Sequence, residues 1–286
     1  MDNNTIVKEF FELQTPSGAI IRGDMRWNHN GVVSKLLPVV IVCHGFKAFK
    51  DWGPFPAIGR YFAEQGFVSI VFNFSHNGIG EHPRKYTEHE KFSINTYTLE
   101  LEDVETLLDA ITEEKLPCPH MDDSKIFLVG HSRGGAIAIV KAKEDRRIKA
   151  VVSWSSISNF NRYSDEQKKR WREKGYVQLH SISNVSAFRI TTALLDDIEQ
   201  NQKRLNILRA VEQLHKPLLI IQGSSDIPVK VDEAKNIYEA SDKNLTKFII
   251  LDGIGHMYGA KHPYREKSST MTHVLELTST WIHNNL

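Results

Sequence analysis

The sequence predicts an α/β protein in which helices flank a mostly parallel, eight-stranded sheet. Three observations support this class. Several apolar runs are continuous in Val, Ile, Leu and Phe, which is typical of parallel strands buried on both faces. Longer segments with helical spacing of apolar residues separate these runs, and this alternation favours a parallel sheet covered by helices on both faces. No internal repeat or low-complexity tract interrupts the pattern.

The strands are expected where short runs rich in β-branched and aromatic residues end at turn signals. The first two are separated by the turn Pro16-Ser17-Gly18, and the other six are spread along the rest of the chain. In order, the expected strands are residues 5–14, 19–27, 36–43, 67–72, 125–129, 149–154, 217–222 and 247–251.

Five helices are expected between and after these strands. The first ends at Gly66, a residue type that commonly terminates helices. The second carries apolar residues three and four positions apart, which places them on one face. The third follows a strand directly. The expected ranges are 54–65, 99–114, 134–143, 231–240 and 268–282.

Residues 155–216 break the alternation, because about 60 residues pass without a convincing strand. Residues 165–174 are expected to form a short basic helix, and residues 191–214 contain further helical periodicity. We therefore expect a helical cap or lid at 155–216, inserted into a core of residues 1–154 and 217–286. A longer crossover with additional helices is the alternative.

Composition excludes several classes of protein. The chain has 286 residues, a net charge of +1, 41% hydrophobic residues and 25% charged residues, which is ordinary for a soluble globular domain. This balance argues against a binder of nucleic acid over its whole surface. Two cysteines, Cys43 and Cys118, are too few for a disulfide framework, and no C-x-x-C metal signature is present. The polar N-terminus and short apolar runs predict a cytoplasmic protein with no membrane partner.

The strongest chemical signal is Gly130-His131-Ser132-Arg133-Gly134, between an expected strand and an expected helix. A serine on such a tight turn projects its hydroxyl above the sheet, and the flanking glycines let the backbone fold without a clash. The helix N-terminus also favours developing negative charge. Ser132 is therefore the predicted nucleophile, with an ordinary glycine-rich turn as the alternative. His131 is expected to point away across the turn.

A serine hydroxyl needs a positioned base, and the base needs a carboxylate to hold its tautomer. His256 follows the last expected strand and precedes the final helix, so a loop can return it over the sheet; His262 is the alternative. Asp226 lies just past a buried strand, at the edge where active sites of parallel sheets gather; Asp252 is the alternative. The chain order is Ser132, Asp226, His256.

Acyl transfer also needs N–H donors for the tetrahedral oxyanion. One candidate is the main-chain N–H of Arg133, directly after the nucleophile. The other is the N–H of Phe46, because His44-Gly45-Phe46 follows an expected strand. Gly45 permits a bent backbone there. His44 is expected to support this loop by hydrogen bonding rather than to act as a base.

With these residues together, the sequence resembles the α/β-hydrolase superfamily. More narrowly, it resembles bacterial esterases related to feruloyl esterases and to dienelactone-hydrolase-like and prolyl-oligopeptidase-like enzymes. The resemblance runs from the first strands to the final helix. It implies the α/β-hydrolase fold and a serine hydrolase that needs no metal or organic cofactor. In such an enzyme Ser132 forms an acyl-enzyme with a small-molecule ester, and water activated by His256 releases the acyl group.

Some features depart from these relatives. Dienelactone hydrolases use a cysteine nucleophile, so Ser132 argues against that activity. The large propeller of prolyl oligopeptidases is absent, which weakens the reading as a small peptidase or amidase without removing it. A ligand-binding protein without catalysis is a further alternative. The oligomeric state is open, with a homodimer among the possibilities.

The substrate pocket is less well indicated than the catalytic residues. His44 and His76 are candidates near the nucleophile, although His76 could instead tie down its own loop. Trp52 follows the expected oxyanion loop, and Phe160 belongs to the inserted region. Trp52 has packing as its alternative. The basic run 168–172 either favours an anionic substrate or is a solvated helix face.

Overall fold

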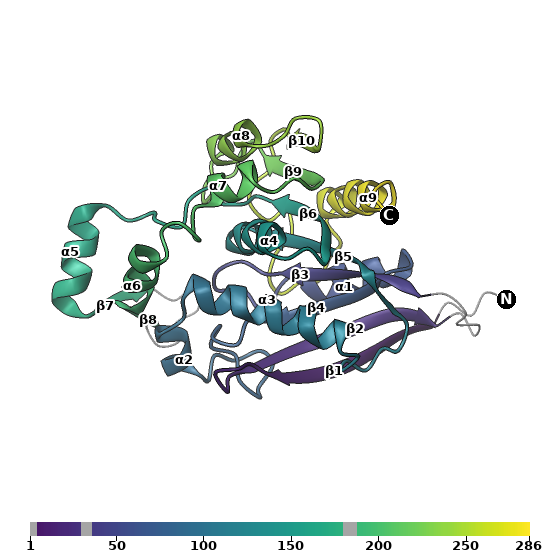
Figure 1. Ribbon diagram of the computed structural model, residues 1–286, viewed down its shortest axis with the longest axis horizontal. Helices are drawn as coiled ribbons and strands as arrows, with labels where there is room; N and C mark the ends of the chain where they lie inside the picture. The colour runs from purple at the N-terminus through teal and green to yellow at the C-terminus, as the bar shows by residue number, and fades with distance from the viewer. Residues whose placement is uncertain (1–4, 30–35, 180–187) are drawn as a thin grey trace.

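The computed structural model describes residues 5–29, 36–179 and 188–286. Residues Met1 to Asn4, which belong to the polar N-terminus used above to predict a cytoplasmic protein, lie outside this part. The eight-stranded sheet has the strand order β1-β2-β4-β3-β5-β6-β9-β10 (Figure 1). Its strands are β1 (Thr5–Gln14), β2 (Ile20–His29), β3 (Leu37–Cys43), β4 (Val68–Asn73), β5 (Met121–His131), β6 (Ile148–Trp154), β9 (Leu218–Gly223) and β10 (Thr246–Leu251).

The expected fold class is confirmed. β2 pairs antiparallel with both β1 and β4, and all other neighbours in the sheet run parallel. All eight expected strands are present. β5 begins at Met121, earlier than expected, because its first residues pair with the start of β3 before a register shift at Pro38/Val39. The extension contains Ser124 and other polar residues, so it lacks the apolar run by which the strand was predicted.

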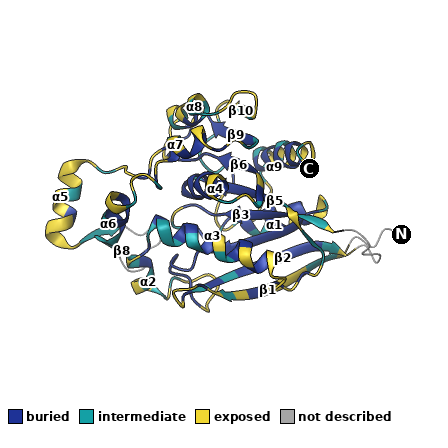
Figure 2. Cartoon of the chain, in the orientation of Figure 1, coloured by how far each residue is buried: buried dark blue, intermediate teal, exposed yellow. Residues whose placement is uncertain are grey.

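Two hydrophobic cores cover the two faces of the sheet. Alternate residues of β3 point to opposite sides: Val39 and Ile41 join one core, whereas Val40 and Val42 join the other. The first core also holds the apolar faces of α3 (Tyr97–Thr112), α4 (Arg133–Glu144) and α8 (Val231–Ala240), and the second those of α1 (Phe55–Glu64) and α9 (Ser269–His283). β4 and β9 are buried along their whole length, and β3, β5 and β6 are buried along their C-terminal parts (Figure 2). This burial explains their continuous apolar sequences.

All five expected core helices are present, and α5 (Asp165–Lys174) coincides with the expected basic helix. α2 (His89–Ser93) was not expected; it has five residues and is too short for helical periodicity to show. Among the helices of the described ranges, none has both the length and the apolar character that crossing a membrane requires.

The inserted segment, residues 155–216, is divided in space: residues 165–179 and 188–200 lie at one end of the molecule, away from α9, whereas residues 207–212 contact α4 and α8 (Figure 1). It contains α5, the antiparallel pair β7 (Tyr176–Leu179) and β8 (Phe188–Thr191), and the short helices α6 (Ala193–Gln200) and α7 (Ile207–Glu212). The expectation that this region lacks strands is therefore wrong. β7 and β8 have only four residues each, which is too few for their alternating pattern to be recognised in the sequence. Its role as a lid stays a prediction.

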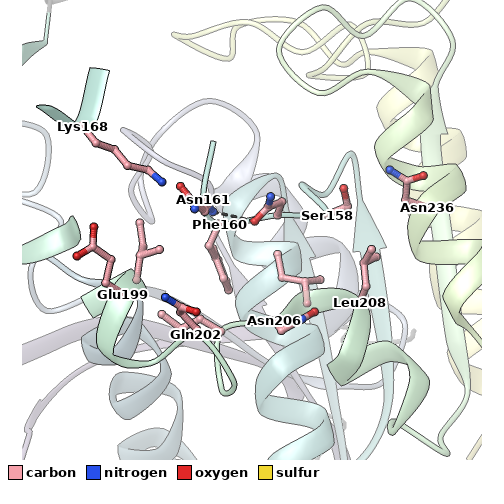
Figure 3. Close-up of a pocket in the computed structure, with 13 residues that line it drawn as sticks. Ser158, Phe160, Asn161, Lys168, Glu199, Gln202, Asn206, Leu208 and Asn236 are labelled. Atoms are coloured by element: carbon pink, nitrogen blue, oxygen red, sulfur yellow. Dashed lines mark hydrogen bonds between the residues drawn. The ribbon is translucent and has the colours of Figure 1, made fainter. Parts of the chain in front are cut away.

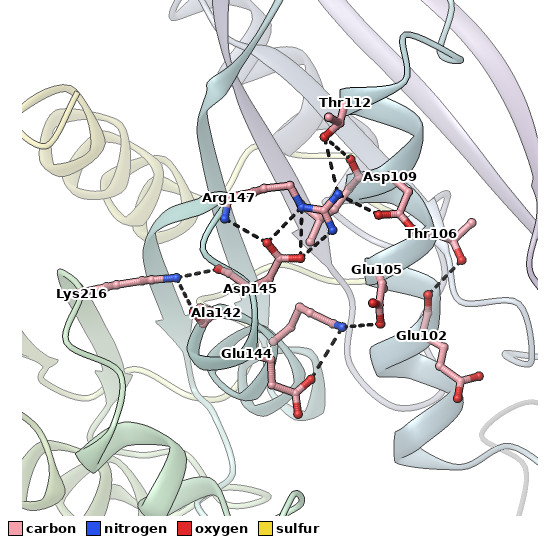
Figure 4. Close-up of polar contacts among 12 residues, drawn as sticks. Glu102, Glu105, Thr106, Asp109, Thr112, Ala142, Glu144, Asp145, Arg147 and Lys216 are labelled. Carbon is pink, nitrogen blue, oxygen red and sulfur yellow. Dashed lines mark hydrogen bonds and ion pairs between the residues drawn. The ribbon is translucent and has the colours of Figure 1, made fainter.

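Polar contacts attach α4 to α3 on the first core's side (Figure 4). Arg147 follows α4 and pairs with Asp145 at 2.6 Å and with Asp109 of α3 at 2.7 Å. Within α4, the buried Lys141 pairs with Glu105 of α3 at 3.0 Å. Partly exposed ion pairs contribute only about 0.2–1 kcal/mol each, so packing dominates the attachment. Together the contacts fix the helix whose start carries the expected nucleophile.

Candidate active site

Ser132 lies in a sharp turn between β5 and α4. Its backbone angles are φ 56° and ψ −122°, a conformation that is strained for a residue with a side chain. The Ser132 N–H donates to the carbonyl of Trp154 on the neighbouring strand β6 at 2.8 Å, and its own carbonyl accepts from Gly135 at 3.0 Å. The turn is thus held on both sides by main-chain hydrogen bonds.

The glycines around Ser132 are required by close backbone approaches. A Cβ atom on Gly130 would lie 2.2 Å from the carbonyl oxygen of Gly134. A Cβ atom on Gly134 would lie 2.4 Å from the carbonyl oxygen of Cys43 and 2.5 Å from that of His44. Both positions therefore bring backbone against backbone, which only glycine allows.

Gly134→Ala is expected to lower the free energy of unfolding by about 1–3 kcal/mol, because the clash is with backbone atoms that cannot rotate away. Urea denaturation measures the change. Gly255→Ala is the matched control, since a Cβ atom there meets nothing nearer than 3.8 Å. Equal stability of the two variants would contradict the prediction.

The structure brings Asp226 and His256 together. The Nδ1 atom of His256 lies 2.8 Å from Oδ2 of Asp226. Because a carboxylate can only accept, Nδ1 carries the hydrogen, and this leaves the lone pair of Nε2 available as a base. The Asp226 carboxylate is buried and also accepts from the side chain of Gln222 at 3.1 Å and the N–H of Val229 at 2.9 Å. Burial favours a raised pKa for Asp226, but the hydrogen bonds outweigh it and lower the pKa.

The two alternative residues lie in other contacts. His262 Nδ1 accepts from the N–H of Gly53 at 2.9 Å, and its ring stacks on Trp52 at 5.4 Å between centroids. Asp252 is exposed and accepts from the hydroxyl of Ser224 at 3.0 Å. Neither is paired with the other as His256 and Asp226 are.

The loop after β3 lies against the nucleophile. A Cβ atom on Gly45 would lie 3.0 Å from the Cβ of Ser132, so glycine permits this approach. The N–H groups of Phe46 and Arg133 are the expected oxyanion donors. Within the described residues, no hydrogen bond uses either N–H, and the first N–H groups of a helix have no partner within that helix. Both donors are therefore available.

His44 supports this loop through hydrogen bonds. Its Nδ1 donates to the carbonyl of Gly45 at 2.9 Å, and its Nε2 lies 3.4 Å from the N–H of Phe74 and 3.3 Å from the side-chain amide of Asn77. Burial lowers the pKa of His44 to about 4, so the ring is neutral. The side chain is only 2% exposed. These contacts favour the supporting role and disfavour a contact between His44 and substrate.

The Arg133 side chain is a feature that sequence reasoning missed. Its guanidinium pairs with Glu100 of α3 at 2.6 Å and lies over the Phe46 ring at 4.5 Å from the centroid. Glu100 is 1% exposed and also accepts from the side chain of Asn95 at 2.8 Å. Arg133 thus joins α3 to the oxyanion loop. Nothing in the sequence around Glu100 distinguishes it from a surface helix residue.

The other candidate substrate residues are engaged in protein contacts, and their substrate roles stay predictions. His76 is 7% exposed, with Nδ1 2.8 Å from the hydroxyl of Ser75. Phe160 is buried, stacks on Tyr97 at 4.1 Å, and lines a cavity of about 740 Å³ whose other lining residues belong to the inserted segment, apart from Asn236 of α8 (Figure 3). Trp52 is partly buried against His262.

The basic run 168–172 does not gather into an anion site. Arg172 pairs with Asp196 at 2.7 Å and Glu199 at 2.8 Å, and Arg170 pairs with Glu166 at 3.0 Å. These contacts favour the reading as a solvated helix face. Within the part of the chain that the structure describes, no group of three or more His, Cys, Asp or Glu side chains could hold a metal ion.

Comparisons with known proteins identify the family. A family model described as the alpha/beta hydrolase fold matches residues 38–176. The "Putative esterase/lipase 2" of Mycoplasma genitalium is 30% identical over 240 residues, covering 76% of this chain and 82% of that protein. An uncharacterized peptidase of Bacillus subtilis is 22% identical, covering 64% of this chain and 26% of that protein. The solved structure of Est1E from Butyrivibrio proteoclasticus with ferulic acid has a TM-score of 0.72, with 17% identity over 96% of this chain and 98% of that chain.

Proposed function

The chain belongs to the α/β-hydrolase family, and we propose that within it this protein is a serine hydrolase that cleaves small-molecule carboxylic esters. One observation carries the proposal. The 2.8 Å contact between His256 and Asp226 fixes the imidazole in the tautomer that can accept a proton from a serine, while Ser132 is held in a strained turn after β5. Backbone strain lowers the stability of the folded protein, and it is commonly found at active sites, where it positions reactive groups.

In the proposed reaction, Ser132 Oγ attacks the ester carbonyl while its proton passes to Nε2 of His256. The carbonyl oxygen gains negative charge and accepts from the N–H groups of Phe46 and Arg133. The intermediate collapses, the C–O bond to the alcohol breaks, and the alcohol leaves with the proton from His256. Water then attacks the acyl-enzyme with His256 as the base, and the acid and free Ser132 are released. Asp226 stabilises the imidazolium of His256 during both acylation and deacylation.

The test is hydrolysis of p-nitrophenyl esters of increasing acyl length, compared with the matched p-nitroanilides. We expect turnover of the esters at rates well above the anilides, because the amine is the poorer leaving group. The Bacillus relative's description as a peptidase makes an amidase the alternative, and preferred cleavage of the anilides would favour it. No turnover of either series would contradict both.

Reaction with a fluorophosphonate separates an enzyme from a ligand-binding protein on the same fold. We expect one probe per chain, attached to Ser132, because only an activated serine attacks phosphorus at a useful rate. Mass spectrometry of the labelled peptide identifies the site. An unlabelled protein, or a probe on another residue, would contradict the proposed nucleophile.

A further inference from the structure

His131, which the proposed mechanism does not use, precedes the nucleophile in the chain and contacts the proposed base His256. The sequence suggested that it points away across the turn, and the structure places its ring against the loop that carries His256. Its Nε2 atom lies 2.9 Å from the main-chain carbonyl oxygen of His256, and the two imidazole centroids are 4.6 Å apart. The side chain of His131 is buried, with 6% of the residue exposed.

The hydrogen bond fixes the tautomer of His131. A carbonyl only accepts, so Nε2 carries the hydrogen and Nδ1 is unprotonated. Within the described residues, Nδ1 has no hydrogen-bond partner, and it faces Gly45, where a Cβ atom would come within 3.3 Å of it. A second proton on His131 would therefore have no acceptor. Burial, reinforced by His256, lowers the pKa of His131 to about 3, so the ring stays neutral.

The main chain around His256 is held on both sides: the carbonyl of Ile254 accepts from the N–H of Ser225 at 2.9 Å, and the carbonyl of Gly255 accepts from the N–H of Tyr258 at 3.1 Å. The bond from His131 adds a restraint on the carbonyl of His256 itself. Gly253 and Gly255 precede His256, and Gly253 has φ 69°, in the left-handed region. Glycines leave this stretch with more conformational freedom than other residues would. Asp226 holds the imidazole only at Nδ1. One hydrogen bond allows the ring to swing about that atom, so a restraint on the main chain of His256 helps to fix Nε2 relative to Ser132.

We propose that His131 is a positioning residue that holds the main chain of His256 and thereby sets the distance between Nε2 and the Ser132 hydroxyl. The inference rests on the proposed function. Because His131 immediately precedes Ser132, the turn that strains the nucleophile also carries the donor that holds the base. His131 touches neither substrate nor a transferred proton in this role. It couples the turn after β5 to the loop after β10.

The test compares His131→Phe with His131→Gln. Phenylalanine keeps the ring and loses the donor, whereas the glutamine amide can donate to the His256 carbonyl. For a chromogenic ester we expect His131→Phe to lower kcat by about 10- to 100-fold, the cost of a small misplacement of catalytic groups. We expect KM to change by less than about 3-fold, because uniform substrate binding is intact. We expect His131→Gln to recover most of the lost kcat.

The matched control is His283→Phe on α9, which replaces another histidine in ring contact, here with Phe67 at 4.7 Å, outside the site. It should retain wild-type kcat. Thermal unfolding of each variant tests whether a loss of kcat results from a loss of folded protein. Wild-type kcat in His131→Phe, or equal loss in the Phe and Gln variants, would overturn the inference. An active Ser132→Ala variant would instead overturn the proposed function.

A measurement on the unmodified protein does not depend on whether a variant folds. Nitrogen-15 NMR distinguishes the two neutral tautomers of an imidazole. We expect His131 to remain the Nε2–H tautomer from pH 8 to pH 5, without titrating. An Nδ1–H tautomer, or titration near pH 6.5, would mean that the bond to His256 is absent and would overturn the inference.

Discussion

Replacing Ser132 with alanine is expected to lower kcat/KM for a chromogenic short-chain ester by about 10⁴-fold or more. Alanine fits the strained turn but supplies no oxygen to form the acyl-enzyme. The oxyanion donors and the binding surface would remain, so a small residual rate over water is expected rather than none. The loss is measured by steady-state hydrolysis with the purified variant and wild type. The enzyme concentrations must be high enough to detect the residual activity of the variant.

Ser124→Ala provides a control on the same strand. Ser124 lies near the start of β5, with its hydroxyl bonded to Asp122, whereas Ser132 follows the strand's other end. We expect this variant to keep wild-type kcat/KM. Activity of Ser132→Ala within about 10-fold of wild type would exclude the proposed nucleophile, because intact triads lose far more when the serine is removed.

Asp226→Asn is expected to lower kcat by about 10³- to 10⁴-fold with a nearly isosteric change. The asparagine amide can present an N–H toward Nδ1 of His256, which would favour the tautomer with hydrogen on Nε2. That tautomer cannot take the proton of Ser132. The loss of the carboxylate also removes the charge that stabilises the imidazolium. Values of kcat from saturation curves separate this effect from weaker substrate binding.

Asp252→Asn tests the alternative carboxylate with the same chemical change. Asp252 is exposed and bonded to Ser224, so we expect kcat within about 2-fold of wild type, as for most surface substitutions away from a site. If Asp252→Asn lost more activity than Asp226→Asn, the assignment of the carboxylate would be reversed.

The sheet and the candidate triad could be predicted because local sequence carries their physical requirements. The strands buried on both faces need continuous apolar residues, and the turn at Ser132 needs glycines where backbone meets backbone. Asp226 and His256 follow the ends of β9 and β10, which are adjacent parallel strands, so their loops open at one edge. Each of these signals depends on residues close together in the chain.

The features that escaped prediction depend on contacts between distant residues. Glu100 has the sequence context of an ordinary helix residue, yet burial against Arg133 makes it part of the support for the oxyanion loop. The contact of His131 with the main chain of His256 was not predicted, because His256 is 125 positions away in the chain. The strands β7 and β8 are too short to show the alternation of apolar and polar residues that predicts a strand.

The inserted segment leaves the sheet after β6 and returns before β9, and these two strands pair directly, with Val151 opposite Leu218 and Trp154 opposite Ile221. The strand pairing is therefore complete without the segment. Its length and sequence can diverge at little cost to the sheet, because loop closure depends only weakly on length. Changes in residues 155–216 are therefore expected to disturb side-chain packing, such as that of Phe160 on Tyr97, before they disturb the pairing of β6 with β9.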